Sequence, residues 1–257
     1  MERSAECPET LLEEEPAGLL DRAAIARQVG QPWERESGVG RALEEAMEAV
    51  ARSLAPRSLS ACFPLAVGAP PQPGGPAGIW IGSRWFEAPY LARRLAPLAP
   101  PRVALFCVTL GSACDALISG LGRRGAVAEA YFADCVASAA ISTLTNRVHE
   151  RLQGAAGARR TFRLSPGIMA RSGSGVAYDR EHWPLAAQAM FAQLLSLDRL
   201  GVRLDQTYWT LQPSKTTTAL VPLCPLPSAA SGGSSGRGRS RRGPSRRAES
   251  PPDDSRA

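Results

Sequence analysis

The chain has 257 residues, of which 44% are hydrophobic, so it is long enough to bury one substantial core or two small ones. Its formal net charge is +6, but residues 228–257, with seven arginines and three acids, account for +4 of that charge. The net charge is therefore poor evidence that the folded part of the chain binds nucleic acid.

The cysteines and the N-terminus narrow the class of protein further. The six cysteines form no CxxC pair, and both histidines lie far from them in sequence, so neither a zinc site nor a dense disulfide framework is expected. The first 16 residues are acidic and lack the regions of a signal peptide, and no apolar run approaches the ~20 residues that span a bilayer. We expect a cytoplasmic protein with reduced thiols and no membrane segment.

In chain order, residues 1–19 are expected to be flexible, and a folded domain is expected over residues 20–227. Its first clear element is an amphipathic helix over 41–54, with Leu43, Met47 and Val50 on one face. The chain then mixes strands with a helix: β-prone runs at 60–67, 78–82 and 102–110, a helix at 88–96, and a Pro/Gly-rich link at 68–78 that joins two strands.

A long helix is predicted over residues 126–152, which are rich in Ala and contain neither Gly nor Pro. Between Glu129 and Arg147 its one charge is Asp134. A carboxylate in so neutral a stretch should pack against protein and needs a hydrogen-bond donor there. Asp134 is therefore either a structural group or a ligand contact.

After a loop at 162–175, the pattern predicts a helix over 184–195 and two short strands, QTYWTLQP and KTTTALVP, that pair with each other. The last 30 residues contain no large apolar side chain and are expected to be a disordered Arg/Ser/Gly-rich tail, 228–257. Its basic clusters could contact RNA or anionic surfaces, but we favour a solvated tail without a specific nucleic-acid partner.

The loop FRLSPG carries the most specific local chemistry. Pro166 fixes one backbone angle and Gly167 permits a positive φ, so the chain can turn sharply and bring its backbone close to a ligand. Arg163 precedes this turn, and its planar fork of donors suits a carboxylate. Lys215 is also distinctive, since it is the one lysine among 30 basic residues.

The sequence contains no recognisable pair of a catalytic nucleophile and its general base, because neither histidine lies in a catalytic motif. Covalent hydrolytic catalysis is therefore not expected. The GSGVA stretch is not a phosphate-binding loop, since no Gly-Lys-Ser/Thr follows it. If the loop binds a ligand, the chemistry belongs to a cofactor held by this chain or by a partner.

Taken in order, the elements resemble the activation (reactivation) domain of cobalamin (vitamin B12)-dependent methionine synthase, especially its free-standing members. The resemblance runs from about residue 20 to 222. It rests on seven segments: the amphipathic helix with LAPRSLSACFPL, GIWIGSRWFEAPYLARRLAP, RVALFCVTLGSACDALI, AEAYFADCVASAAISTLTNRVHERL, RLSPG, HWPLAAQAMFAQLL and DRLGVRLDQTYWTLQPSKTTTAL.

The resemblance implies an α+β domain, with a twisted antiparallel sheet and flanking helices, that binds S-adenosylmethionine in a shallow groove. In the family this domain docks over the corrinoid, so that cob(II)alamin, once reduced by an electron donor, is methylated back into the cycle. By resemblance, Arg163 pairs with the ligand's carboxylate, the backbone at Ser165 and Gly167 contacts the ligand, and Lys215 occupies the family's own Lys position.

The chain departs from the family at two expected ligand contacts. Ile168 stands where the family usually has Tyr, and Ser142 stands where many members carry Glu. Asp134, two helical turns before Ser142 on the same face, is the carboxylate that we expect to compensate.

Two functions follow from the resemblance. The first is an accessory subunit for the S-adenosylmethionine-dependent reactivation of a methionine synthase whose corrinoid-binding subunit carries the cobalamin. The second is a docking module for a corrinoid protein or methyltransferase that does not use S-adenosylmethionine. The retained Arg163, Ser165, Gly167 and Lys215 favour the first function, and the replaced Tyr and Glu favour the second.

Overall fold

The computed structural model describes residues 8–30, 37–68, 71, 74–158, 161–167 and 183–226. All of them belong to one unit that ends at Leu226. The expected disordered tail, residues 228–257, lies outside the described residues.

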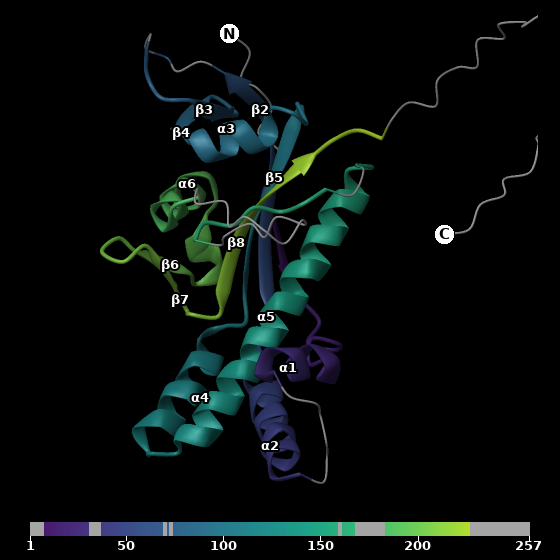
Figure 1. Cartoon of the computed structure of the whole chain (residues 1–257), viewed down its shortest axis with the longest axis vertical. Helices are drawn as coiled ribbons and strands as arrows, with labels where there is room; N and C mark the ends of the chain where they lie inside the picture. Colours follow the sequence, from purple (N-terminus) through teal and green to yellow (C-terminus); the bar gives the residue numbers. More distant parts are fainter. Residues whose placement is uncertain are drawn as a thin grey trace, which may run out of the picture. The chain divides into compact units, whose positions relative to one another are not determined.

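The centre of this unit is an antiparallel sheet in which neighbouring strands follow the order β4-β3-β2-β5-β8 (Figure 1). The strands in this order are β2 (Arg57–Gly68), β3 (Gly78–Ile81), β4 (Arg84–Glu87), β5 (Arg102–Thr109) and β8 (Thr216–Leu223), and β1 (Thr10–Glu13) joins the same sheet beside β2. β5 is buried at every position except Arg102, because the sheet is covered on both faces, and six of the seven buried residues are apolar. The strands expected at 60–67, 78–82 and 102–110 are thus confirmed, as is the link that joins β2 to β3.

Alternate residues of β5 enter two separate cores. Ala104, Phe106 and Val108 join the core under one set of helices: α1 (Arg22–Val29), α2 (Gly38–Ser53), α4 (Ser112–Arg123) and α5 (Val127–Ala155). Leu105 and Cys107 face the opposite core, which contains α3 (Pro89–Leu95), α6 (Gln188–Leu194) and the small hairpin of β6 (Arg203–Asp205) and β7 (Thr210–Gln212). The fold is therefore α+β, an antiparallel sheet with flanking helices, as expected.

The predicted helices form, and side-chain caps explain where α2 and one further helix, α1, begin. The Oγ of Ser37 accepts a hydrogen bond from the Gly40 amide at the start of α2 (2.9 Å), and α2 buries Leu43 and Val50 as its spacing predicts. α1 was not predicted from the sequence. It begins at the N-cap Asp21, ends at Gly30 in the left-handed conformation, and buries Ile25 completely.

α5 extends the predicted long helix to 29 residues. By length and composition it is the one helix in the described part of the chain that could cross a membrane, with a mean hydropathy of 1.2. In this fold 44% of that apolar window is buried, and the helix packs against α1, α2, α4 and the sheet. The apolar composition of α5 is thus also what a core helix requires.

The predicted pairing of QTYWTLQP with KTTTALVP is wrong. β7, in the first run, pairs with β6, whereas β8, in the second, pairs along its whole length with β5. The reason is local: Asp205 Oδ1 accepts hydrogen bonds from the amides of Thr207 (2.8 Å) and Tyr208 (3.3 Å), which closes a turn between β6 and β7. Much of the first run is therefore turn rather than strand.

The domain begins earlier than the expected residue 20. β1 (Thr10–Glu13) pairs with the first residues of β2, and Leu19 is completely buried in the core under α5. Residues 1–19 were expected to be flexible, whereas the structure pairs part of that segment with the edge of β2.

Candidate functional site

The loop that carries Arg163 lies beside β8 as a short additional edge. Leu164 and Leu220 exchange both backbone hydrogen bonds, at 2.9 and 2.8 Å. The turn that follows requires Gly167, because its φ is +77° and a Cβ there would lie 3.0 Å from Leu185 Cδ1. The Gly167 amide donates to the Trp183 carbonyl (2.8 Å), which ties the turn to the segment before α6.

Arg163 is half-buried, and its partner is a residue of α5. Its Nη1 donates to Asn146 Oδ1 at 2.6 Å. Burial lowers the pKa of the Arg163 guanidinium from its ordinary value, although an arginine remains charged at neutral pH. The loop thus holds a cation that is partly removed from water.

A cleft of about 300 Å³, which we call the Ser165 cleft, opens beside this loop. Ser165 is 8% exposed, and its Oγ is buried without a hydrogen-bond partner among the described residues. A hydroxyl that forms no hydrogen bond within the described fold and lies in a cleft wall is available to a molecule in the cleft, whether water or a ligand. The other walls include Leu185, Gln188, Trp209, Thr216, Thr217 and Thr218.

Gln188 and Thr218 are held in place at the base of this cleft. The Thr218 hydroxyl donates to Gln188 Oε1 at 2.6 Å, and both residues are buried. Because Gln188 Oε1 accepts this bond, the two N–H donors on Gln188 Nε2 remain as the other hydrogen-bonding groups of the side-chain amide. Trp209 forms the aromatic wall of the cleft. It lies at the end of the β6–β7 turn and has a φ of +55°.

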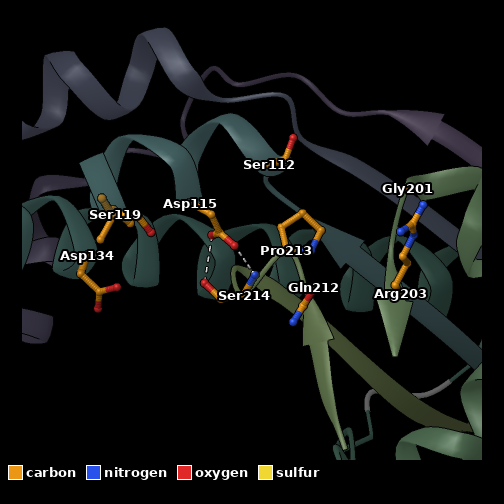
Figure 2. A pocket seen from close by; sticks show the side chains of 10 residues that line it. Ser112, Asp115, Ser119, Asp134, Gly201, Arg203, Gln212, Pro213 and Ser214 are labelled. Carbon is orange, nitrogen blue, oxygen red and sulfur yellow. Dashed lines mark hydrogen bonds between the residues drawn. The ribbon is translucent and has the colours of Figure 1, made fainter. Parts of the chain in front are cut away.

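A second cleft of about 500 Å³, the Asp134 cleft, lies between α4, α5 and the turn of residues 212–214 (Figure 2). Asp115 of α4 fixes this turn, because its Oδ1 accepts from Ser214 Oγ (2.9 Å) and its Oδ2 from the Ser214 amide (2.5 Å). Arg203 and Asp134 also line the cleft. Ser214 lines both clefts, so the turn separates the two.

Lys215 and Asp134 form an ion pair across the groove between β8 and α5. Lys215 Nζ lies 2.6 Å from Asp134 Oδ1 and donates to Ser138 Oγ at 2.9 Å. The lysine side chain is 13% exposed and the aspartate 50% exposed, so Asp134 finds the donor that the sequence required but is not buried. A compact ammonium can reach two groups one helical turn apart, which is a physical reason for lysine here.

Ser142 and Ile168 lie apart from these contacts. The exposed Ser142 hydroxyl donates to the carbonyl of Ser138 one turn earlier (2.9 Å), and Ser142 lines neither cleft. Ile168 lies outside the described residues. Arg163 is near Ser165 along the chain but is not among the described residues that line the Ser165 cleft.

Sequence reasoning identified the loop, Lys215 and Asp134, but it missed four other residues of the site. Asn146, Asp115, Gln188 and Trp209 supply the contacts or walls of the site. Asn146 carried one usable signal, since it is the single asparagine in the chain. Gln188 carried another, as a polar residue in an otherwise apolar run before Met190 and Phe191.

No model of a protein family and no curated protein matches this chain. Among solved structures, the chain is similar to the crystal structure of the MetH reactivation domain bound to AdoHcy, with a TM-score of 0.58 and 14% sequence identity. The match covers 84% of this chain and 78% of that chain. At this identity the likeness is one of fold, and the chain therefore has the fold of that reactivation domain.

Proposed function

We propose that this chain binds S-adenosylmethionine at the Ser165 cleft and acts as an accessory subunit in the reactivation of a cobalamin-dependent methionine synthase, whose corrinoid-binding subunit carries the cobalamin. S-adenosylmethionine supplies the methyl group in such a reaction. The observation that carries the proposal is the buried Ser165 hydroxyl, which lacks a partner in the wall of a cleft. The fold supports it, because the similar domain was solved with AdoHcy, a related ligand.

The residues of the cleft fit this ligand chemically. The hydroxyls of Thr216 and Thr217 and the amide of Gln188 offer hydrogen bonds to a sugar or a base, and Trp209 offers an aromatic face. A volume of about 300 Å³ is at the lower end for small-molecule sites, so the cleft suits part of the ligand, with the rest along the surface.

Arg163 would hold the carboxylate of the ligand. It lies two residues before Ser165, its charge is half-buried, and Asn146 orients its guanidinium from one side. A charge-assisted hydrogen bond from arginine to a carboxylate is stronger than a neutral one and sets the orientation of the ligand. The absence of a Cβ at Gly167 would let the backbone of the turn approach the ligand closely.

One observation favours the alternative, a docking module that does not use S-adenosylmethionine. Asp134, the carboxylate that we expected to replace the family's Glu, is paired with Lys215 and lines the other cleft. Ser142 supplies no negative charge either. The positive charges of the ligand would therefore meet fewer carboxylates than the family provides.

A reactivation assay tests the proposal and separates the two functions. The full chain is added, with a reductant and S-adenosylmethionine, to a cobalamin-dependent methionine synthase that lacks its own reactivation domain and has been left as cob(II)alamin. We expect the absorbance of cob(II)alamin to disappear at a rate that Arg163→Ala lowers at least about tenfold, because a hydrogen bond to a charged group contributes about 1.5–3 kcal/mol.

Arg203→Ala is the matched control, since Arg203 is an exposed arginine of the neighbouring cleft. It should leave the rate unchanged. If the chain binds the corrinoid protein but neither wild type nor variant changes the cob(II)alamin spectrum, the docking function is correct and the reactivation function is wrong.

A further inference from the structure

The residues that precede the first helix are fastened to α5, the helix that contacts Arg163. We call residues 9–17 the N-terminal segment. β1 within this segment pairs with the start of β2, from Thr10 opposite Ser60 to Glu13 opposite Arg57. The Glu14 amide then donates to the Pro56 carbonyl (2.8 Å), which carries the pairing one residue further.

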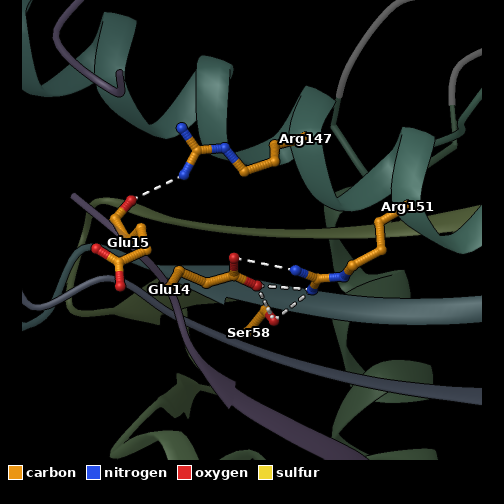
Figure 3. A network of polar contacts seen from close by, with 5 residues as sticks. All are labelled: Glu14, Glu15, Ser58, Arg147 and Arg151. Carbon is orange, nitrogen blue, oxygen red and sulfur yellow. Dashed lines mark hydrogen bonds and ion pairs between the residues drawn. The ribbon is translucent and has the colours of Figure 1, made fainter. Parts of the chain in front are cut away.

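Glu14 forms the central contacts between the N-terminal segment and α5, although it belongs to no motif (Figure 3). Its carboxylate accepts two hydrogen bonds from Arg151 of α5, at 3.0 and 2.6 Å, and one from the hydroxyl of Ser58 in β2 at 2.5 Å. Arg151 also donates to Ser58 Oγ at 3.0 Å. One buried carboxylate therefore joins the N-terminal segment, the sheet and α5.

The charge on Glu14 is well compensated. The residue is 8% exposed. Burial by itself raises the pKa of Glu14, but the hydrogen bonds from Arg151 and Ser58 and the nearby positive charges outweigh it, so the pKa is lowered from its ordinary value. Glu14 is thus an anion at neutral pH and keeps the contacts of a charged pair.

Arg147 adds a second attachment one turn earlier on α5. Its guanidinium donates to the carbonyls of Glu15 and Ala17, both at 2.8 Å. Arg147 and Arg151 are four residues apart and so lie on the same face of α5. Together they fix the turn of α5 between them against the N-terminal segment.

The partner of Arg163 lies directly before this turn. Asn146 is the neighbour of Arg147 in sequence, and its Oδ1 accepts the hydrogen bond from Arg163. Any rotation or shift of α5 here would move Asn146 relative to the loop of Arg163, because a helix turn behaves as a rigid unit. The network around Glu14 and the candidate ligand site are therefore joined through adjacent turns of α5.

From this arrangement we propose that Glu14 is a positioning residue: through Arg151 and α5 it sets the place of Asn146, and so the orientation of Arg163 in the candidate ligand site. The role in ligand binding rests on the proposed function. The geometric part, the link from Glu14 to the pair of Asn146 and Arg163, does not.

The N-terminal segment offers a matched control at its other end. Glu9 pairs with Arg199 (2.9 Å) and accepts a hydrogen bond from the Ser196 amide (2.7 Å), and neither partner belongs to α5. Glu9→Gln and Glu14→Gln make the same chemical change in the same segment. Only the second change acts on α5.

The test uses the full chain with selectively ¹⁵N-labelled asparagine, because Asn146 is the single asparagine and its side-chain NH2 gives one pair of cross-peaks at a single ¹⁵N shift, which serves as the signal. We expect Glu14→Gln to shift this signal toward its position in Arg163→Ala, and Glu9→Gln to leave it in place. In parallel, Glu14→Gln should raise the dissociation constant for S-adenosylmethionine on the order of fivefold, the size of coupling within one contact network.

The outcomes separate the two claims. An unmoved Asn146 signal in folded Glu14→Gln, or an equal shift in Glu9→Gln, overturns the positioning role. If the wild type does not bind S-adenosylmethionine, the proposed function fails and the amide signal alone decides the geometric claim. If Glu14→Gln does not fold, Arg151→Lys, which keeps the charge and loses the two-pronged contact, takes its place with the same expected shift.

Discussion

Ser165 and Gly167 show how two small residues shape the candidate site. Gly167 is required by a positive φ and by the nearness of Leu185, so the turn has its form with or without a ligand. Ser165 is different, because its buried hydroxyl makes no hydrogen bond to the described residues. A polar group that makes no contact within the fold and lies in a cleft wall is free to bind a molecule there, so we assign it to binding rather than to folding.

Ser165→Ala should therefore change stability and affinity in opposite directions. Removing a hydroxyl that lacks a partner should leave the free energy of unfolding of the free protein unchanged or raise it by up to about 1 kcal/mol. The affinity for S-adenosylmethionine should fall by about three- to tenfold, the equivalent of one hydrogen bond. Denaturant unfolding and calorimetric titration measure the two effects. A loss of stability without a loss of affinity would show that the hydroxyl serves the fold.

Lys215 and Asp134 show which part of an ion pair can be predicted from sequence. Its rarity and its place after Pro213-Ser214 marked it in the sequence, and so did the isolation of Asp134 in a neutral helix. Their ion pair joins residues 81 positions apart (134 to 215). The local sequence pattern around each residue does not indicate a contact with a residue so distant in the chain. The residues could thus be selected in advance, but the fact that they satisfy each other could not.

At the scale of elements, α5 connects most of what has been described. One side of it carries Asp134, Ser138 and Ser142, of which the first two bind Lys215. Its later turns carry Asn146, which binds Arg163, and Arg151, which binds Glu14. A helix with so many polar attachments keeps a fixed register against the sheet, which a purely apolar contact face does not enforce.

The attachment of the N-terminal segment to α5 should weaken in acid. The pKa of Glu14 is lowered in the folded state, so its contribution to stability is complete above the pKa of the unfolded chain, about 4.3 for a glutamate. That contribution is lost as the pH falls through the lower folded pKa. At neutral pH, Glu14→Gln should lower the free energy of unfolding by about 1.5–3 kcal/mol, as for hydrogen bonds to a charged group.

Urea unfolding at a series of pH values between 7 and 3 checks this expectation. The difference in free energy of unfolding between wild type and Glu14→Gln should be constant near neutrality and shrink below the unfolded pKa. Glu9→Gln, at the exposed ion pair with Arg199, should show a difference of at most about 1 kcal/mol throughout. A difference for Glu14→Gln that grows in acid would have the wrong sign and would contradict the lowered pKa.

The elements that the sequence predicted best are those in which apolar residues recur at regular spacing over a long run. α2, α5 and the main strands follow from spacing and composition, because each buries a consistent face. β1 and the hairpin of β6 and β7 did not follow. β1 is exposed at every position and is held by its backbone and by Glu14, and the hairpin is set by the turn at Asp205, so neither leaves an apolar period to detect.

At the scale of the whole molecule, the fold and the sequence lead to the same family of structures by different routes. The resemblance rested on short segments in a particular order, and the likeness to the MetH reactivation domain rests on the shape of the described chain at 14% identity. The fold by itself does not carry function, since one fold hosts many activities. The candidate function therefore depends on whether the Ser165 cleft binds its ligand.

The most direct test of that claim is calorimetric titration of S-adenosylmethionine into the full chain, with wild type, Arg163→Ala and Arg203→Ala compared. We predict saturable binding by wild type and Arg203→Ala, and a dissociation constant about 10- to 100-fold higher for Arg163→Ala, because a charge-assisted contact to the carboxylate is lost. The absence of binding by wild type at millimolar ligand, or equal binding by all three proteins, would contradict the account.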